Sequence, residues 1–466
     1  MKYRICIAWL LGIWIGYPLM VCAQNNKPNI LVIMTDQQSS QMLSITGNKW
    51  LDTPNLDRLA RQGVRFEKAY ATNPVCVPSR FSLQTGLYPS IIGVRHNESK
   101  VNSELNEKLI KHSLGQVFRN AGYETIYGGK VHLPGHFNNI KTFGYSLLTN
   151  DSRGPLARKS ADYLLHKAGG NQPFFMFLSF INPHDICYNA IKTFEPNSSL
   201  AQHAPKPVLN ALEKPEGISE KKFWKQFVPP LPSNFEPTVG EPQAIRNLIA
   251  LRSFRKRARE NWDIKGWRRH RWAYKQLTER ADSLIGIVLD ALEKSGLKDN
   301  TIVVFTSDHG DMDSSHRLEH KTVFYREAVR IPFIFAGKGI ISGQADNHLV
   351  SNGLDLFPTL CDLAGIEPPD GLEGRSLKPL LTGKSSKNWR EYLFAENQIG
   401  FMVTDGRYKY RWYDGTDEEM FTDLINDPGE MINIIPYLDE YKTDYKEKYK
   451  ELKAVLFDHL ESIGMR

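Results

Sequence analysis

The chain has 466 residues, of which 41% are hydrophobic and 24% are charged, a composition typical of a folded globular protein rather than of a disordered or fibrous one. Lys and Arg number 59 against 52 Asp and Glu, so the net charge is +7, a modest excess that suits an anionic substrate. Because nothing else in the sequence is typical of a nucleic-acid reader, we expect no nucleic acid among its partners. The length predicts one large domain and a smaller one.

Residues 1–23 predict a secretory signal peptide. Two basic residues precede an apolar run over residues 5–21, and small residues near Ala23 suit cleavage. This run is too short and too poorly flanked for a convincing membrane span, and no other stretch is apolar enough to be one. We therefore expect an exported protein, periplasmic or secreted. The alternative is a lipoprotein anchored at Cys22, which ends an imperfect lipobox.

Three cysteines follow the signal region, namely Cys76, Cys187 and Cys361. So sparse a set cannot form a disulfide scaffold, even in an exported protein. The sequence leaves open whether Cys187 and Cys361 pair or stay free.

Continuous apolar runs predict strands that are buried on both faces of a parallel sheet. These runs lie at residues 28–35, 125–127, 174–181, 301–306 and 332–336. Helical patterns lie between them, at residues 53–62, 113–121, 272–295 and 353–364. Strands that alternate with helices predict an α/β sandwich, in which polar residues at the strand ends build the functional site.

The pattern changes at about residue 389, where short runs separated by Asp-Gly turns predict antiparallel strands. The runs lie at residues 392–395, 401–403 and 407–412, and a charged helix is predicted near 437–462. We therefore divide the chain after the signal into a main domain, residues 24–388, and a small C-terminal α+β subdomain, residues 389–466. The Pro-rich and weakly periodic residues 191–242 predict an insertion or a long loop.

The sequence Cys76-Val77-Pro78-Ser79-Arg80, followed by Thr85-Gly86, is the stretch around which the chain is organised. Pro78 suits the first turn of a helix and Gly86 suits its end. Cys76 would then lie where free backbone N–H groups and the helix dipole favour an anion. Arg80 would follow about one turn later, so its guanidinium could face whatever Cys76 attacks. A buried structural cysteine is the alternative, which the polar, Pro-rich surroundings disfavour.

This stretch resembles the signature of the type I sulfatases, the formylglycine-dependent family of the alkaline phosphatase superfamily. Matching motifs recur in family order over most of residues 28–430. The resemblance implies an alkaline phosphatase-like fold, with a large mixed, mostly parallel sheet between helices, and it makes residues 24–388 the catalytic domain. It also implies that a formylglycine-generating maturation enzyme oxidises Cys76, and that the hydrated aldehyde at this modified residue is the nucleophile.

Two pairs of residues, each with one aspartate, resemble the metal-binding pairs of that family. Asp36-Gln37 follows the first predicted strand, and Asp308-His309 follows a later one. Such a set can hold one divalent cation that polarises the substrate and the nucleophile. Capping of a strand end is the alternative for either pair alone, but both pairs together with Cys76 favour a metal site. The resemblance favours Ca²⁺, whereas the small number of carboxylates leaves Mg²⁺ or Mn²⁺ open.

Further family motifs contain Lys130 and His132, which follow a strand, His184 in Asn-Pro-His, and Lys321 beyond the Asp308 loop. The resemblance implies that Lys130 and Lys321 clamp the sulfate. It implies that His132 acts as a base on the nucleophile and that His184 protonates the leaving oxygen or binds the sulfate. A lone Lys or His is more often a solvated residue, but the family order favours function. His316, Arg317 and His320 are extra candidates for substrate contact.

The function implied is hydrolysis of sulfate monoesters on a sulfated carbohydrate, as in bacterial glycosaminoglycan sulfatases. One alternative is a phosphodiester or phosphonate monoester hydrolase of the same superfamily, which can use similar metal pairs. Another is a catalytically silent protein that binds sulfated glycans and keeps Cys76 unmodified. In residues 252–275, basic residues alternate with aromatic ones, which could bind a sulfated sugar. We favour the alternative, that this stretch is the solvated entrance to the helix that follows.

Overall fold

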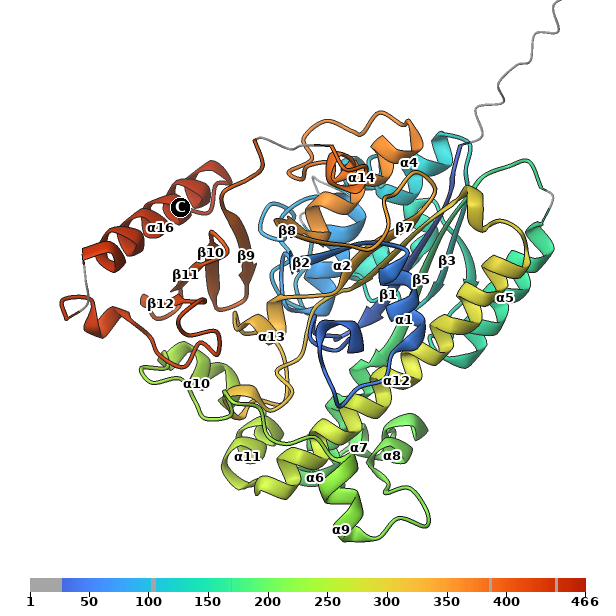
Figure 1. Ribbon diagram of the computed structural model, residues 1–466. Coiled ribbons are helices and arrows are strands. Elements are labelled where there is room, and N and C mark those ends of the chain that lie inside the picture. Colours follow the sequence, from blue (N-terminus) through green and yellow to red (C-terminus); the bar gives the residue numbers. More distant parts are fainter. Residues whose placement is uncertain (1–26, 102–105, 169, 385–387, 441–442) are drawn as a thin grey trace, which may run out of the picture.

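The computed structural model describes residues 27–101, 106–168, 170–384, 388–440 and 443–466 (Figure 1). The predicted signal peptide, with Cys22, lies outside these residues. Among the described helices, none combines the length and the apolar character that crossing a membrane requires.

The main sheet has eight strands in the order β4-β3-β5-β1-β6-β7-β2-β8. All neighbours are parallel except β7, which runs antiparallel to both β6 and β2, so the expected mixed and mostly parallel sheet is confirmed. The strands are β1 (Asn29–Asp36), β2 (Gly63–Tyr70), β3 (Glu124–Gly129), β4 (Ser146–Thr149), β5 (Phe174–Pro183), β6 (Thr301–Ser307), β7 (Phe333–Gly337) and β8 (Gln344–Ser351).

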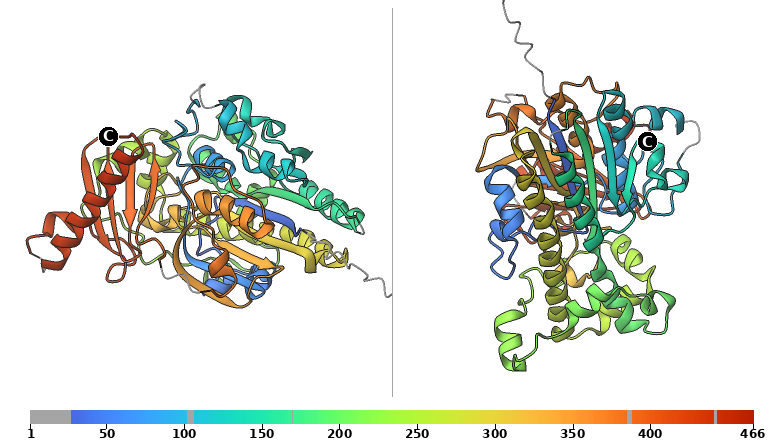
Figure 2. Two further views of the ribbon diagram at one scale, coloured as in Figure 1. Left: turned by 90° about the horizontal axis from the view of Figure 1, so that it is seen from above. Right: turned by 90° about the vertical axis from the view of Figure 1, so that its right-hand side faces the viewer.

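Helices cover both faces of this sheet because alternate side chains of its central strands point to opposite sides. In β1, Leu31 and Ile33 pack in one core with α1 (Pro54–Arg61), α5 (Gly154–Lys167) and α12 (Ile264–Lys294). Ile30 and Val32 pack in the other with α2 (Cys76–Thr85), α4 (Leu114–Asn120) and α14 (Asn352–Ala364). Figures 1 and 2 show the resulting three layers, with α5 and α12 side by side on the first face.

Strands β2, β4 and β8 were not among the predicted strands. The strand β2 carries Arg65, Glu67 and Lys68 at half-buried positions, and β8 begins with exposed polar residues. Such strands lack the continuous apolar run by which the central strands are recognised. The first helices were located within a residue or two, whereas α12 begins at Ile264 rather than near residue 272, with Asp263 accepting a 2.7 Å hydrogen bond from the backbone of Gly266 as its cap.

Residues 191–242 form an insertion rather than one long loop. The short helices there are the end of α6 (Cys187–Phe194), α7 (Ser199–Gln202), α8 (Lys206–Leu212) and α9 (Glu220–Lys222), and α10 (Gln243–Ala250) and α11 (Ser253–Asn261) lead on to α12. The other short helices are α3 (Asn106–Lys111), α13 (Arg326–Val329) and α15 (Lys378–Leu381). The insertion lies beyond the N-terminal end of α12, at the bottom of Figure 1.

The C-terminal part has a four-stranded antiparallel sheet in the order β12-β11-β10-β9, covered by α16 (Thr443–Ser462). Its strands are β9 (Leu393–Asn397), β10 (Gly400–Thr404), β11 (Tyr408–Tyr413) and β12 (Glu418–Asp423). The division of the chain at residue 389 stays a prediction.

Within the described part of the chain, Cys76, Cys187 and Cys361 are all unpaired, so the open question of a disulfide is answered.

The buried His270 of α12 makes the fold sensitive to acid. Its side chain is fully buried, its Nδ1 lies 3.3 Å from Nδ2 of Asn189, and its Nε2 has no hydrogen-bond partner among the described residues. Burial, with a smaller contribution from Arg271, lowers the pKa of His270 to about 3. The unfolded chain binds this proton at pH values below about 6.5, so the stabilisation from keeping His270 neutral is lost as pH falls from 6.5 towards 3.

We expect His270 to account for about 2 kcal/mol of the free energy of unfolding that is lost between pH 7 and pH 5. The His270→Gln variant should therefore lose about 2 kcal/mol less than the parent over this range, measured by urea unfolding at both pH values. The exposed His203 provides the control, because His203→Gln should follow the parent. Equal losses in the parent and in His270→Gln would contradict the prediction.

Candidate active site

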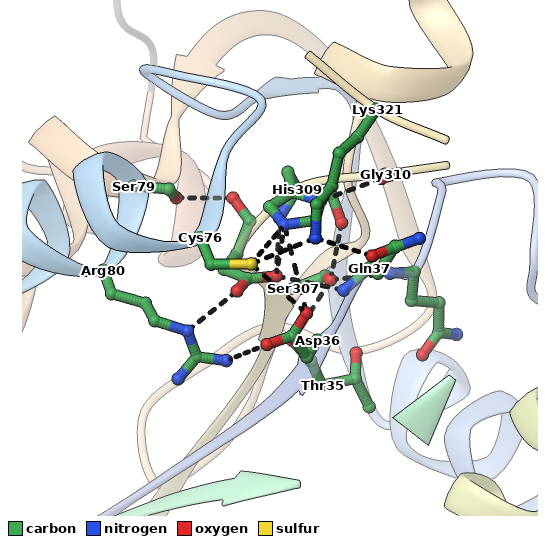
Figure 3. A network of polar contacts seen from close by, with 12 residues as sticks. Thr35, Asp36, Gln37, Cys76, Ser79, Arg80, Ser307, His309, Gly310 and Lys321 are labelled. Atoms are coloured by element: carbon green, nitrogen blue, oxygen red, sulfur yellow. Dashed lines mark hydrogen bonds and ion pairs between the residues drawn. The ribbon is translucent and has the colours of Figure 1, made fainter. Parts of the chain in front are cut away.

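Cys76 opens α2 at the edge of the sheet where β1 and β6 end. Val75 before it is extended, and Gly86 ends the helix in the left-handed region at φ 71°, as glycine readily does. The predicted start and end of this helix are therefore confirmed. Cys76 is 1% exposed, and its Sγ faces the residues that follow the two strands (Figure 3).

Four side chains converge within a space that suits a metal ion. Ligand atoms of Asp36, Cys76, Asp308 and His309 all lie within 4.8 Å of one another, and all four residues are buried. Nδ1 of His309 is 2.8 Å from the carbonyl oxygen of Gly310, which fixes the proton on Nδ1 and leaves the lone pair of Nε2 directed into the cluster, 3.2 Å from Sγ. Three of the four predicted metal ligands, Asp36, Asp308 and His309, thus lie together.

The charges of the two carboxylates also fit a cation. Burial and Cys76 act to raise the pKa of Asp36, but Lys130, His184 and Arg80 outweigh them and hold it well below its ordinary value. Burial and the neighbouring Asp36 raise the pKa of Asp308 despite Arg80. Two like charges so close together repel, and a divalent cation between them would favour the ionised form of both.

Arg80 is bonded to both of these carboxylates. Its guanidinium donates to Asp36 at 2.7 Å and to Asp308 at 2.8 Å. Two further N–H groups reach the carbonyl oxygen of Lys130 at 2.9 Å and the hydroxyl of Ser179, within β5, at 2.7 Å. Burial would lower the pKa of Arg80, but the two carboxylates raise it, so the guanidinium stays charged and holds their orientation.

Gln37 has its carboxamide held by other groups. Its Oε1 accepts a 2.6 Å hydrogen bond from Lys321, and its Nε2 donates to Asp311 at 2.6 Å. The backbone of Gln37 is left-handed, at φ 70°, and its N–H donates to Asp308 at 3.0 Å. Asp311, three residues after Asp308, received no role from the sequence alone; it orients Gln37. The assignment of Gln37 as a fourth metal ligand stays a prediction.

Two lysines place positive charge on Cys76. Nζ of Lys321 lies 3.0 Å from Sγ, and Nζ of Lys130 lies 3.9 Å from Sγ and 2.5 Å from Asp36. Burial alone would raise the pKa of the Cys76 thiol, but Lys130, Lys321 and His309 outweigh burial and hold it well below its ordinary value. The two lysines and His309 therefore stabilise a negative charge at the position of Sγ.

His132 and His184 lie half-buried beside this group, and Nδ1 of each has no partner among the described residues. Burial, followed by the charge of Lys130, lowers the pKa of His184 to about 4, so this imidazole is neutral at neutral pH. His132 makes a smaller contribution to the lowered pKa of Cys76. Both predicted histidines therefore come together with the predicted nucleophile.

The extra candidates behave differently from one another. His316 is fully buried, stacks on Tyr325 with 3.8 Å between ring centroids, and bonds to Asn234 and Thr238, so it is part of the core and not a substrate contact. Arg317 is at the surface, paired with a glutamate. His320 faces the site, with Nδ1 3.5 Å from Sγ of Cys187.

Comparisons with known proteins agree with this geometry. The sulfatase family model matches residues 28–366, and the model for the C-terminal region of N-sulphoglucosamine sulphohydrolase matches residues 314–461. The chain is 32% identical to a delta 4,5-hexuronate-2-O-sulfatase and 27% identical to an N-acetylglucosamine-6-O-sulfatase, both from Bacteroides thetaiotaomicron; the alignments cover 92% and 93% of this chain, and 91% and 86% of those proteins. The solved structure of a 2-O GAG sulfatase superposes with a TM-score of 0.75 at 29% identity, covering 94% of this chain and 93% of that one. The chain therefore belongs to the sulfatase family of the alkaline phosphatase superfamily, and it is a sulfuric ester hydrolase.

Proposed function

We propose that this sulfatase hydrolyses a sulfate monoester on a sulfated carbohydrate, with formylglycine derived from Cys76 as its nucleophile. The observation that carries the proposal is the enclosure of Cys76 by two carboxylates, one imidazole and two lysines. Asp36, Asp308 and His309, with Gln37 as the further predicted ligand, would hold one divalent cation, Ca²⁺ by family resemblance. When bound, that cation would supply Lewis-acid stabilisation of negative oxygen.

Sγ of Cys76 marks the place where the oxygens of the formylglycine side chain would stand. Lys130 and Lys321 approach that place from two sides, so their ammonium groups would bind sulfate oxygens or the oxygen that attacks sulfur. Negative charge develops on the leaving sugar oxygen as the ester bond breaks, and fixed cations in a buried site can stabilise developing charge more than they stabilise the bound substrate.

The two histidines would handle protons. A neutral His184 can donate a hydrogen bond from its one N–H to the leaving sugar oxygen, while His132 can accept a proton from the nucleophile position. Lys130, His132 and His184 are half-buried rather than fully buried, so we place the carbohydrate on their side of the site. Arg80 would act indirectly, by keeping Asp36 and Asp308 oriented.

The carbohydrate assignment draws on the relatives, whose names refer to hexuronate, N-acetylglucosamine and GAG sulfates. A glycosaminoglycan or a similar sulfated glycan is accordingly the proposed substrate class. Export to the periplasm or beyond, where such polymers occur, is proposed from the signal-like residues 1–23, and oxidation of Cys76 by a maturation enzyme is proposed from the motif.

Neither alternative function is favoured. A phosphodiesterase of the superfamily could use the same metal pairs, but a phosphodiester offers two terminal oxygens instead of three and brings a second ester arm. A protein that only binds glycans needs no nucleophile surrounded by paired histidines and lysines, and here these residues lie together.

We expect the active protein to carry formylglycine at position 76, which peptide mass spectrometry measures directly. Cys76→Ala should still bind sulfated saccharide but lose turnover, since it keeps the lysines and removes the nucleophile. Cys361→Ala is the matched control and should retain activity, because Cys361 lies in the core away from the site. A fully active preparation that contains only unmodified Cys76 would refute the mechanism.

Removal of one carboxylate should weaken metal binding. We expect Asp308→Asn to lower the affinity for divalent cations at least about tenfold, because it removes one charged oxygen ligand of two. Calorimetric titration with Ca²⁺, Mg²⁺ and Mn²⁺, together with metal analysis, would measure the affinity and identify the ion. The exposed Asp299→Asn serves as the control. Unchanged affinity in Asp308→Asn would exclude this residue as a ligand.

The substrate class is tested by comparing defined sulfated saccharides with aryl phosphodiesters. We expect kcat/KM on the best sulfated saccharide to exceed that on any phosphodiester by at least about a hundredfold, equivalent to about 2.7 kcal/mol of transition-state stabilisation. Lys321→Ala should lower sulfate-ester turnover far more than Lys265→Ala, a change at an exposed lysine. An equal or better phosphodiester would replace the proposed function with its alternative.

A further inference from the structure

A small cavity lies along the side chain of Lys321, between α10, α11 and the segment that carries Lys321. Its volume is about 20 Å³, and its polar lining comes from Arg255, Arg317, Glu319, His320 and Lys321. A space of this size holds one water or one similarly small polar group. Arg255 belongs to the basic stretch of residues 252–275 for which the sequence favoured a solvated surface.

Arg255 and Glu319 both lack hydrogen-bond partners in the described part of the chain, although Oε2 of Glu319 lies 3.9 Å from Nδ1 of His320. Arg255 is half-buried, its Nε is enclosed, and no hydrogen bond or ion pair reaches its guanidinium; it has only a distant ring contact, 5.8 Å from the Phe254 centroid. Glu319 is 3% exposed, and neither of its carboxyl oxygens accepts a hydrogen bond. Buried polar groups are nearly always paired in native proteins, so these two side chains have hydrogen-bonding capacity available for a ligand.

Two residues that line the cavity also lie near the nucleophile. Lys321 reaches from the cavity to within 3.0 Å of Sγ of Cys76. His320 lies next to both regions: burial, then Arg255, Lys321 and His184, lower its pKa well below the ordinary value. Lys321 and His320 therefore line the cavity and also lie beside Cys76 and Cys187, respectively.

We propose that Arg255 and Glu319 form a subsite for a second anionic substituent, a carboxylate or a further sulfate, on the saccharide whose sulfate ester is hydrolysed. This inference rests on the proposed function. The guanidinium carries a charge that no described carboxylate neutralises by contact, so an anion is preferred over a hydroxyl group. Only the oxygens of the substituent would enter the small cavity, while the ring would stay outside it.

Glu319 is compatible with an anionic neighbour. Burial raises the pKa of Glu319 to about 7, against the opposing effects of Arg255 and Lys321. Near neutral pH its carboxyl group can carry a proton, and it can then donate a hydrogen bond to an anion that also accepts from Arg255.

Binding to the inactive Cys76→Ala protein tests the subsite without relying on turnover. The probes are a 2-O-sulfated hexuronate saccharide, a disulfated glucosamine, and a monosulfated N-acetylglucosamine that has no second anion. We expect Arg255→Gln, added to Cys76→Ala, to lower the affinity for the hexuronate or for the disulfated probe at least about tenfold more than that for the monosulfated probe. The probe that loses most identifies the substituent. Arg255→Lys should lose less, because it keeps the charge.

Arg252→Gln is the matched control. Arg252 lies three residues before Arg255, its side chain is 60% exposed, and its nearest acidic partner, Glu98, is 3.8 Å away. Its change should leave the ratio of affinities as in the parent. Equal losses on all three probes, or no loss on any, would overturn the subsite. If the probes bind as expected but the Cys76 protein hydrolyses no sulfate ester, the proposed function fails and the subsite stands.

Discussion

The site depends on one buried guanidinium. Arg80 joins α2 to the ends of β1 and β6 through Asp36 and Asp308, with exposures of 2% for Arg80 and 0% for both carboxylates. Loss of one partner from such a buried group costs about 3–5 kcal/mol, because the remaining charges are left unpaired. The interaction that orients the carboxylates for a cation is therefore also one that fixes the helix carrying Cys76 against the sheet, so the chemistry and the local fold are stabilised together.

The parallel arrangement of the strands explains why much of this site could be predicted from the sequence. The carboxyl ends of β1, β5 and β6 lie at one edge, so the acidic residues that follow two apolar runs had to be neighbours. The helix start at Cys76 was recognisable from Pro78 and Gly86. The roles of Lys130, His132, His184 and Lys321 came from resemblance, since a single Lys or His after a strand carries no signal of its own.

Other parts of the site could not be predicted, because they depend on contacts between distant segments. Ser179 accepts a hydrogen bond from Arg80, yet a serine within a strand is unremarkable in a sequence. Asp311 holds Gln37 only because the loop after β6 folds back on the loop after β1. Arg255 lies in a helix of mostly exposed cations, and only its packing against the Lys321 segment distinguishes it from them. The polar strands β2 and β8 were missed in the sequence for a similar reason. They are strands because they pair with neighbouring strands that are distant in the sequence.

The three cations near Cys76 differ in what remains available to a substrate. Four of the five N–H groups of Arg80 are bonded to protein groups, so it contributes mainly charge and the orientation of the carboxylates. Lys130 is 14% exposed, and the ammonium group of Lys321 is bonded, within the described part of the chain, to Gln37 and Cys76 alone. Both lysines can therefore transfer hydrogen bonds to an arriving oxygen. A lysine suits this role because its three donors rotate, whereas the rigid fork of an arginine suits a fixed pair of carboxylates. The charge next to the two carboxylates must stay in place during the reaction, and an arginine provides it. The charges next to the nucleophile must exchange hydrogen-bond partners during the reaction, and lysines provide them.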